Sequence, residues 1–346
     1  MRAVVFARPG RVELADVPEP SIERPDDAVV RVTRAAICGS DLHFLHGKTP
    51  TAPGAVLGHE AVGVVQTIGA AVTTVRPGQR VVVSFAAACG TCWFCAHEQT
   101  NLCERAAVFG AGPFGGDLAG TQTEMVRVPW ADVNLLAVPD AVDDERAVFA
   151  GDVLTTGFHA ATLAGARPGE VVAVLGAGPL GWSCAASLRA LGVERVFVLD
   201  REPSRLALAS ALGAVPVHVG ERSAESALAE ATDDRGADVS IDAVGSVDGY
   251  RSATTIVRRG GRVVVAGVYA GESVELQLGV AWARALDVRF TGVCPVHRHW
   301  RQVMRLLEAG TLEPTPLVSD RIRLEDAAEG YERFDRRLAT KVLIEP

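Results

Sequence analysis

The spacing of apolar and polar residues changes character about 150 residues into the chain. Before that point, short apolar runs are separated by Gly, Pro and Asp, the residues that favour turns. We expect strands at 1–7, 28–34, 62–68 and 80–84. This pattern predicts a β-rich domain in the first part of the chain.

From residue 171 onward, apolar runs of strand length alternate with longer stretches of helical length. Strands that alternate with such helices predict a parallel, doubly wound sheet. After residue 286 the pattern becomes mixed again. The expected strands are 171–175, 196–200, 215–219, 237–242, 262–267 and 341–344, and the later helices are 299–309 and 324–336.

A chain of 346 residues is long enough for two domains. We predict a β-rich domain made of residues 1–150 and 287–346, and an α/β domain of residues 151–286 inserted into it. The change of pattern occurs without a low-complexity linker. The second domain is therefore expected to be an insertion and not an appended module.

Composition excludes several classes of protein. The net charge of −8 and the absence of a basic cluster argue against a nucleic-acid or anionic-membrane partner. Apolar stretches are interrupted well short of a membrane span. Residues 1–7 have the pattern of a strand, without the features of a secretory signal. The expected location is therefore the cytoplasm.

Four of the seven cysteines lie within fifteen residues of one another. An odd number of cysteines argues against a complete disulfide framework, and clustered cysteines in a cytosolic chain indicate metal binding. Four thiolates at this spacing surround one tetrahedral zinc ion with no open position, which is the pattern of a structural site. The predicted ligands are Cys89, Cys92, Cys95 and Cys103.

A glycine-rich turn follows the expected strand at 171–175 and opens a helix. Its glycines permit close approach of a pyrophosphate to a helix N-terminus. Asp200 ends the next strand, where a carboxylate accepts hydrogen bonds from ribose hydroxyls and repels a 2′-phosphate, so NAD is favoured. Arg201 leaves NADP possible. The predicted cofactor residues in this domain are Gly176, Gly178, Pro179, Leu180, Gly181, Asp200, Arg201, Val244 and Val268.

A second group of metal-binding residue types lies outside the four-cysteine cluster. Cys38 is followed by Ser40, Asp41 and His43, and His59 and Glu60 come soon afterwards. A thiolate and an imidazole are good zinc ligands, and the hydroxyl and second imidazole give means to move a proton near a metal.

Asp152 lies among apolar residues shortly before the α/β domain begins. A carboxylate in such surroundings is costly unless it is paired or bound to a metal. An aspartate before a helical stretch is also typical of a helix N-cap. The segment alone leaves both interpretations open.

These motifs resemble the zinc-containing alcohol dehydrogenases of the medium-chain dehydrogenase/reductase superfamily. The resemblance runs nearly end to end and is most specific at Gly58-His59-Glu60-x2-Gly63-x5-Gly69-x2-Val72. The segment from Gly120 to Pro129 and the residues around Asp152 are similar to the formaldehyde-dehydrogenase-like subgroup. The resemblance implies a GroES-like catalytic domain and a Rossmann nucleotide domain.

The resemblance also implies roles for single residues. The catalytic zinc ligands would be Cys38, His59 and Asp152, and polyol-dehydrogenase relatives use Glu60 in place of the third ligand. Asp41 would hold the ring of His59. The remaining implied roles are substrate contact by Ser40, proton relay by His43, an influence of Glu60 from beside the metal, nicotinamide packing by Thr156 and pyrophosphate binding by Lys341.

The expected activity is hydride transfer between a primary or secondary alcohol and NAD(P), in a homodimer or homotetramer. Two separate ligand sets predict two zinc ions per chain, one catalytic and one structural. One alternative is a polyol or threonine-type dehydrogenase with zinc on Glu60. The other is a nucleotide-binding protein that has lost catalysis, which the complete set of Cys38, Ser40, His43 and His59 argues against.

Overall fold

The computed structural model describes residues 1–346 apart from the side chains of Pro113 and Phe114. The chain forms two compact units. One, which we call the split domain, contains Met1–Thr155 and Pro295–Pro346; the other, the inserted domain, contains Thr156–Cys294. The sequence-based boundaries after residues 150 and 286 lie a few residues before these.

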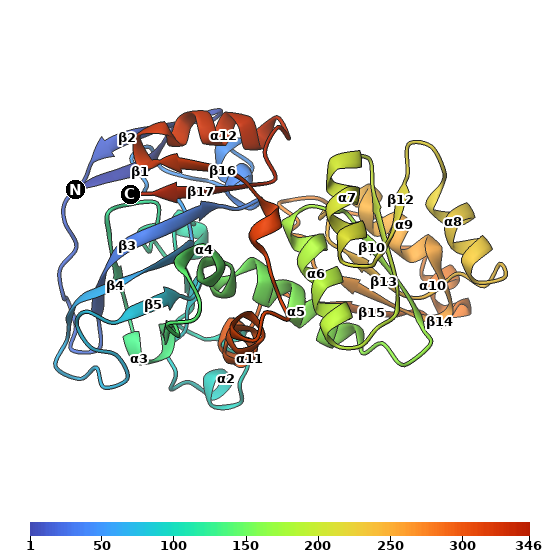
Figure 1. Cartoon of the computed structure of the whole chain (residues 1–346), viewed down its shortest axis with the longest axis horizontal. Helices are drawn as coiled ribbons and strands as arrows, with labels where there is room; N and C mark the ends of the chain where they lie inside the picture. Colours follow the sequence, from blue (N-terminus) through green and yellow to red (C-terminus); the bar gives the residue numbers. More distant parts are fainter. The chain divides into compact units, whose positions relative to one another are not determined.

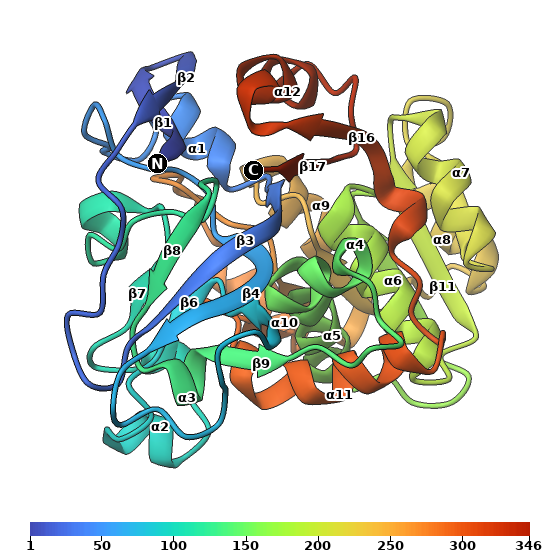
Figure 2. The same cartoon turned by 60° about the vertical axis from the view of Figure 1, so that its left-hand side comes forward.

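The split domain is built on a seven-stranded sheet of order β16-β17-β3-β4-β5-β9, with β8 also paired to β3. Figure 2 shows β3 and β4 side by side in this sheet. A hairpin of β1 and β2 and a small pair of β6 and β7 complete its strands. The strands are β1 Arg2–Arg8, β2 Arg11–Asp16, β3 Ala28–Ile37, β4 Glu60–Ile68, β5 Arg80–Val83, β6 Ala86–Ala87, β7 Ala107–Val108, β8 Met125–Val128, β9 Leu135–Ala137, β16 Val318–Arg323 and β17 Lys341–Glu345.

Most helices of the split domain are short, and α11 and α12 are the longer ones. Buried apolar residues of β3, β4 and β5 join those of α12 in one core. The helices are α1 Asp41–Leu45, α2 Trp93–Ala96, α3 Ala131–Asn134, α4 Asp144–Ala147, α11 Val296–Glu308 and α12 Ala327–Asp335, with 3₁₀ turns η1 Thr100–Leu102, η2 Gly112–Gly115, η3 Val148–Gly151, η4 Thr315–Leu317 and η5 Leu324–Asp326.

The inserted domain is the predicted parallel sheet, with strand order β12-β11-β10-β13-β14-β15 and helices on both faces (Figure 1). Apolar residues of α5, α6 and α7 pack on one face, and those of α8 and α9 pack on the other. The elements are α5 Val153–Ala164, β10 Val171–Leu175, α6 Pro179–Ala190, β11 Arg195–Asp200, α7 Pro203–Ala211, β12 Val215–His218, α8 Ala224–Ala231, β13 Ala237–Asp242, α9 Val247–Ile256, β14 Val257–Val265, α10 Leu278–Ala283 and β15 Asp287–Phe290.

One expectation about the inserted domain was wrong. The domain was expected to end at residue 286, but β15 pairs in parallel with β14 and is the sixth strand of its sheet. The strand is only four residues long, begins with Asp287, and none of its residues is fully buried. A short edge strand with mixed polarity lacks the continuous apolar run that identifies a buried parallel strand.

None of the helices in the described part of the chain has the length and apolar character that crossing a bilayer requires.

Candidate functional site

The register of two neighbouring strands brings the first two predicted zinc ligands together. Ala36 near the end of β3 pairs with Glu60 at the start of β4. Cys38 follows the one strand and His59 precedes the other, so the antiparallel pairing places both beyond the same edge of the sheet. The positions of these residues therefore follow from the strand pairing itself.

Asp152 completes this group from the turn after η3. Its Oδ2 lies 3.6 Å from the Sγ of Cys38 and 3.3 Å from the Nε2 of His59. One ligand atom from each of the three residues lies within 4.8 Å of the other two. The structure thus brings together residues that are 114 positions apart in the chain, and we call them the thiolate–imidazole–carboxylate cluster.

The cluster has the chemistry that a zinc ion requires. His59 is 4% and Asp152 is 8% exposed. Burial, together with the carboxylates of Glu60 and Asp152, raises the pKa of Cys38. Burial alone would lower the pKa of His59, but Asp41 and Cys38 raise it well above its usual value. The Cys38 thiol thus ionises reluctantly without a nearby cation, and a buried set of sulfur, nitrogen and oxygen donors around one point fits Zn²⁺.

Two residues of the Cys38 segment lie beside His59: Asp41, which was expected to hold its ring, and Ser40, which was expected to contact the substrate. Asp41 is fully buried, and its Oδ1 lies 3.3 Å from His59 Nδ1. Ser40 places its Oγ 3.2 Å from Nε2 of the same ring. His43 lies in α1, where its backbone N–H donates to the carbonyl of Ser40. Asp41 therefore has the position of a group that orients the imidazole through its second nitrogen.

Glu60 and Lys341 form a buried ion pair next to the cluster. Lys341 is 1% exposed, its Nζ contacts Oε2 of Glu60, and its ammonium lies 5.7 Å from the ring centroid of Phe149. Burial would lower the pKa of Lys341, but Glu60 and Cys38 raise it. The pair accounts for the buried ammonium of Lys341, and the expected contact of this residue with the cofactor pyrophosphate stays a prediction.

The four predicted structural ligands also come together. The sulfurs of Cys89, Cys92, Cys95 and Cys103 lie within 4.8 Å of one another, and all seven cysteines of the chain are free. Backbone N–H groups donate to two of these sulfurs: Cys92 to Cys89 Sγ at 3.4 Å, and Arg105 to Cys103 Sγ at 3.3 Å.

These N–H donors favour the thiolate form that binds metal. Burial would raise the pKa of Cys89, but the backbone N–H groups of Thr91 and Cys92 lower it to about 5. We call residues 89–103 the four-cysteine lobe.

His297 ties α11 to the region of the four-cysteine lobe. Its Nδ1 lies 3.0 Å from Thr100 Oγ1, and its Nε2 lies 2.8 Å from Asn134 Oδ1. The same Asn134 oxygen accepts the backbone N–H of Ala88. Since Asn134 Oδ1 can only accept, the ring must carry its proton on Nε2. Burial lowers the pKa of His297 to about 4.

This depressed pKa predicts acid sensitivity. The unfolded chain binds a proton near the usual pKa of 6.5 and the folded protein only near 4, so stability falls as the pH drops from about 6.5 to about 4. One pKa unit corresponds to about 1.4 kcal/mol, which makes the loss roughly 3 kcal/mol. His297→Gln keeps a donor and an acceptor but does not titrate. Urea unfolding at pH 7 and pH 5 should show a smaller loss in this variant, and an equal loss would contradict the assignment.

The glycine-rich turn lies between β10 and α6 in the inserted domain, as predicted. Gly176 has φ +91°, and a Cβ on Gly181 would lie 1.8 Å from the carbonyl oxygen of Gly176. Asp200 at the end of β11 fixes the turn, because its Oδ2 accepts the backbone N–H of Ala177 at 2.6 Å. The turn therefore opens a helix N-terminus at the carboxyl edge of a parallel sheet, where dinucleotides bind in such folds.

The other predicted cofactor residues of this domain differ in their surroundings. Val244 and Val268 follow β13 and β14 and are 52% and 55% exposed. A Cβ on Gly176 would lie 3.0 Å from Val244 Cγ2, so Val244 borders the turn. Thr156 is half-buried in α5.

A basic residue that the sequence analysis did not select lies at the turn. Arg201 is exposed, whereas Nη1 of Arg205 lies 3.7 Å from the position of a Cβ on Gly178. Arg205 lies in the first turn of α7, where side chains lean toward the N-terminus of the helix and so toward the glycines. Its place in the first turn of the helix expected after Asp200 is the signal that would have identified it.

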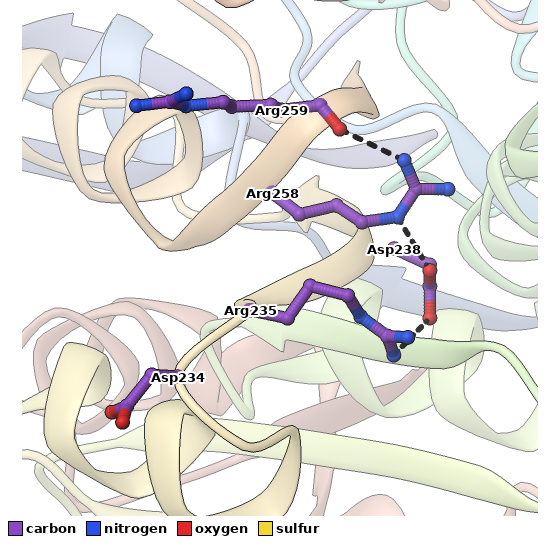
Figure 3. A pocket seen from close by; sticks show the side chains of 5 residues that line it. All are labelled: Asp234, Arg235, Asp238, Arg258 and Arg259. Carbon is purple, nitrogen blue, oxygen red and sulfur yellow. Dashed lines mark hydrogen bonds and ion pairs between the residues drawn. The ribbon is translucent and has the colours of Figure 1, made fainter.

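A surface hollow lies elsewhere on the inserted domain. It has a volume of about 670 Å³ and is lined by Asp234, Arg235, Asp238, Arg258 and Arg259. Figure 3 shows that Arg235 and Arg258 both point at Asp238, with a distance of 2.6 Å from Arg258 Nε to Asp238 Oδ1. The hollow is lined by ion-paired side chains at the surface. It lies where the parallel strands β13 and β14 begin, and therefore at the edge of the sheet opposite to the glycine turn, which follows the end of β10.

Family models match most of both domains. The alcohol dehydrogenase GroES-like domain matches residues 24–140, and the zinc-binding dehydrogenase domain matches residues 179–309. A protein of Mycobacterium tuberculosis named "Probable zinc-binding alcohol dehydrogenase" is 39% identical over 332 residues, covering 96% of this chain and 84% of its own. The glutathione-independent formaldehyde dehydrogenase of Pseudomonas aeruginosa is 33% identical, with 100% and 97% coverage.

A solved structure agrees over the whole chain. Alcohol dehydrogenase TADH from Thermus sp. ATN1 matches with a TM-score of 0.95 and 43% identity, covering 100% of this chain and 99% of that one. The predicted fold class, a GroES-like domain with a Rossmann domain, is confirmed. The chain belongs to the zinc-binding alcohol dehydrogenases of the medium-chain dehydrogenase/reductase superfamily and is a zinc-dependent alcohol oxidoreductase.

Proposed function

We propose that this enzyme interconverts primary or secondary alcohols and their aldehydes or ketones, with NAD as the hydride acceptor and Cys38, His59 and Asp152 as the catalytic zinc ligands. The observation that carries the proposal is the buried thiolate–imidazole–carboxylate cluster, whose ligand atoms lie within 4.8 Å of one another. Three protein ligands leave one position of a tetrahedral ion for substrate, as in catalytic zinc sites.

The rival third ligand, Glu60, has a different partner. Its Oε2 contacts the ammonium of Lys341, so this oxygen already has a positive counter-charge. Asp152 Oδ2 instead faces Cys38 and His59. The arrangement supports Asp152 as the resting ligand over the polyol-dehydrogenase pattern, with Glu60 acting from beside the metal.

We assign to the surrounding residues the tasks of orienting the ligands and moving a proton. When bound, zinc supplies Lewis-acid chemistry that favours loss of the hydroxyl proton from an alcohol and polarises a carbonyl in the reverse reaction. Asp41 holds the His59 ring with Nε2 facing Cys38 and Asp152. Ser40, whose hydroxyl lies 3.2 Å from that nitrogen, accepts the substrate proton, and His43 passes it toward solvent.

NAD is proposed over NADP because of the carboxylate at the end of β11. Asp200 holds the glycine turn through Ala177, and a carboxylate there repels the 2′-phosphate of NADP. Arg205 beside Gly178 offers a positive charge to the pyrophosphate. Thr156, Val244 and Val268 remain the proposed contacts of the cofactor in the inserted domain, and Lys341 remains the proposed contact of its pyrophosphate.

A substrate panel tests the proposal. Simple primary and secondary alcohols, sugar alcohols and threonine are each offered with NAD and with NADP, and reduction is followed at the nicotinamide absorbance. We expect turnover of simple alcohols with NAD. Turnover restricted to polyols or threonine would favour the Glu60 pattern, and a fully zinc-loaded protein without turnover of any compound would contradict the proposal.

A second experiment concerns the proton path. His43→Ala is expected to slow alcohol oxidation mainly below neutral pH, because hydroxide in the solvent replaces the lost relay at high pH. The kcat is measured from pH 6 to pH 10 for the variant and the parent, with zinc content confirmed in each. A loss of the same size across this range would assign His43 to packing instead.

We also propose a homodimer or homotetramer in the cytoplasm. The outer strand β15 and the neighbouring α10 expose large apolar side chains: Leu278 is 72%, Trp282 84% and Phe290 67% exposed. An apolar group of this kind beside an open sheet edge marks an interaction surface. Light scattering should give a dimer or tetramer mass that Trp282→Glu reduces, and a monomer at micromolar concentration would exclude the assembly.

A further inference from the structure

The segment from Gly120 to Gln122 lies against Leu57 and Gly58, the two residues that precede His59. The backbone N–H of Thr121 donates to the Gly58 carbonyl at 2.9 Å, and that of Gln122 donates to the Leu57 carbonyl at 3.0 Å. A Cβ on Gly120 would lie 2.1 Å from the Leu57 carbonyl oxygen. The two backbones therefore touch, which explains why a glycine begins this motif.

Gln122 turns its side chain toward Asp41. Its Nε2 donates to Asp41 Oδ2 at 3.3 Å and to the Ala36 carbonyl at 3.1 Å. A Cβ on Gly58 would lie 2.4 Å from Gln122 Cγ, so the glycine before His59 leaves room for this amide. Gln122 and Asp41 are both fully buried.

The amide of Gln122 is in turn held by Tyr331 of α12. Asp41 and the Ala36 carbonyl only accept hydrogen bonds, so they require the NH₂ end of the amide. The amide oxygen therefore faces the other way and accepts the phenol O–H of Tyr331 at 2.9 Å. Burial raises the pKa of Tyr331 well above its usual value, so the phenol stays protonated and remains a donor. An amide flip would place an oxygen against a carboxylate.

Asp41 links Gln122 and Tyr331 to two of the proposed metal ligands, Cys38 and His59. Its Oδ2 also accepts the backbone N–H of Cys38 at 2.9 Å, and its Oδ1 lies 3.3 Å from His59 Nδ1. One carboxylate thus orients two ligands of the cluster. A carboxylate that is free to rotate holds an imidazole less well, and groups behind a metal ligand commonly alter affinity by about 10- to 100-fold.

We propose that Gln122 and Tyr331 are positioning residues that act through Asp41 to slow the loss of zinc from the catalytic cluster. This rests on the proposed assignment of Cys38, His59 and Asp152 as ligands. α12 thereby contributes to metal retention although it supplies no ligand of the cluster.

The test is the rate at which a chelator in excess removes each zinc ion from the loaded protein. Tyr331→Phe removes only the phenol oxygen, and Gln122→Met removes the amide with little change in volume. We expect each variant to lose the catalytic zinc about 3- to 10-fold faster, with release of the lobe zinc unchanged. Because the residues act in series, the double variant should be no faster than the faster single variant.

Tyr250→Phe is the matched control, since it deletes a buried phenol of the inserted domain. Thermal unfolding of all variants shows whether a change in zinc release follows a general loss of stability. Unchanged catalytic zinc release in the variants, additive effects, or equal acceleration of both zinc ions would overturn the proposal. The same release experiment on Cys38→Ser tests the ligand assignment separately. If the unsubstituted protein and Cys38→Ser release the same amount of zinc, the assignment of the ligands fails instead.

Discussion

Asp152→Asn is expected to retain the zinc of the four-cysteine lobe and to lose the catalytic zinc. The variant keeps the shape of the side chain but removes its charge, and a neutral amide is a much weaker ligand for Zn²⁺ than a carboxylate. The Oδ2 atom that lies 3.3 Å from His59 has no equal replacement. Substitution of residues that only support a metal ligand lowers affinity by up to about 100-fold, so loss of a ligand itself should lower the affinity for the catalytic zinc by more than that. The kcat should fall in proportion to the zinc occupancy of the site.

The comparison variant must respect the buried ion pair at Glu60. Glu60→Gln alone leaves the ammonium of Lys341 buried without its counter-charge, which destabilises a protein by about 3–5 kcal/mol. Glu60→Gln combined with Lys341→Gln removes both charges and is the better control. We expect this double variant to keep both zinc ions and to lose rate only. Zinc lost from the double variant and kept in Asp152→Asn would establish Glu60 as the ligand.

Cys103→Ser is expected to release the lobe zinc and to destabilise the split domain. A structural zinc in peptides of this kind contributes about 10–16 kcal/mol of apparent binding free energy, which is coupled to folding. Cys103 is also the acceptor for the N–H groups of Cys89 and Arg105, so its loss loosens two turns of the lobe. The unfolding midpoint should fall markedly while the catalytic zinc keeps its affinity in the protein that remains folded.

Cys184→Ser provides the control for this substitution. Cys184 is fully buried in the core of the inserted domain, so the same change there reports the effect of a hydroxyl in an apolar interior. Loss of zinc should occur only in Cys103→Ser. A Cys103→Ser variant that is as stable as its parent yet inactive would show that the lobe has been assigned the wrong role.

The sequence predicted the elements whose residues are buried on both faces. β10 has the bounds expected from its continuous apolar run, 171–175, because parallel strands covered by helices are almost continuously apolar. β13 also has its expected bounds, 237–242, although polar residues alternate with its apolar ones. β15 was assigned to the wrong domain because a four-residue edge strand has no such run. Local pattern therefore identified the central strands and the edge strand β12, which was expected at 215–219, but not the opposite edge strand β15.

The two zinc groups differed in how far sequence alone could identify them. The four cysteines of the lobe lie close in the chain, so their spacing indicated one site. Cys38 and Asp152 are 114 residues apart, and only the resemblance connected them, since the local sequence around Asp152 also suited a helix cap. Strand pairing and the η3 turn are what bring these residues together.

The sequence did not reveal which buried polar residues pair with each other across long distances in the chain. Glu60 and Lys341 are 281 residues apart, and Gln122 and Tyr331 are 209 apart. Neither pair has a spacing that marks a contact, because each is created by packing of β17 or α12 against the first strands. The partners of a buried polar group become visible only once its surroundings are known.

The most direct test of the account is the zinc content of the protein purified without any chelator, measured for the parent and for the Cys38→Ser variant. The account predicts about two zinc ions per chain in the parent, one for each ligand set. The variant should contain about one, with the lobe intact and alcohol-dependent reduction of NAD abolished. About one zinc ion per chain in the parent, with no change in the variant, would contradict the assignment of a catalytic zinc to Cys38, His59 and Asp152.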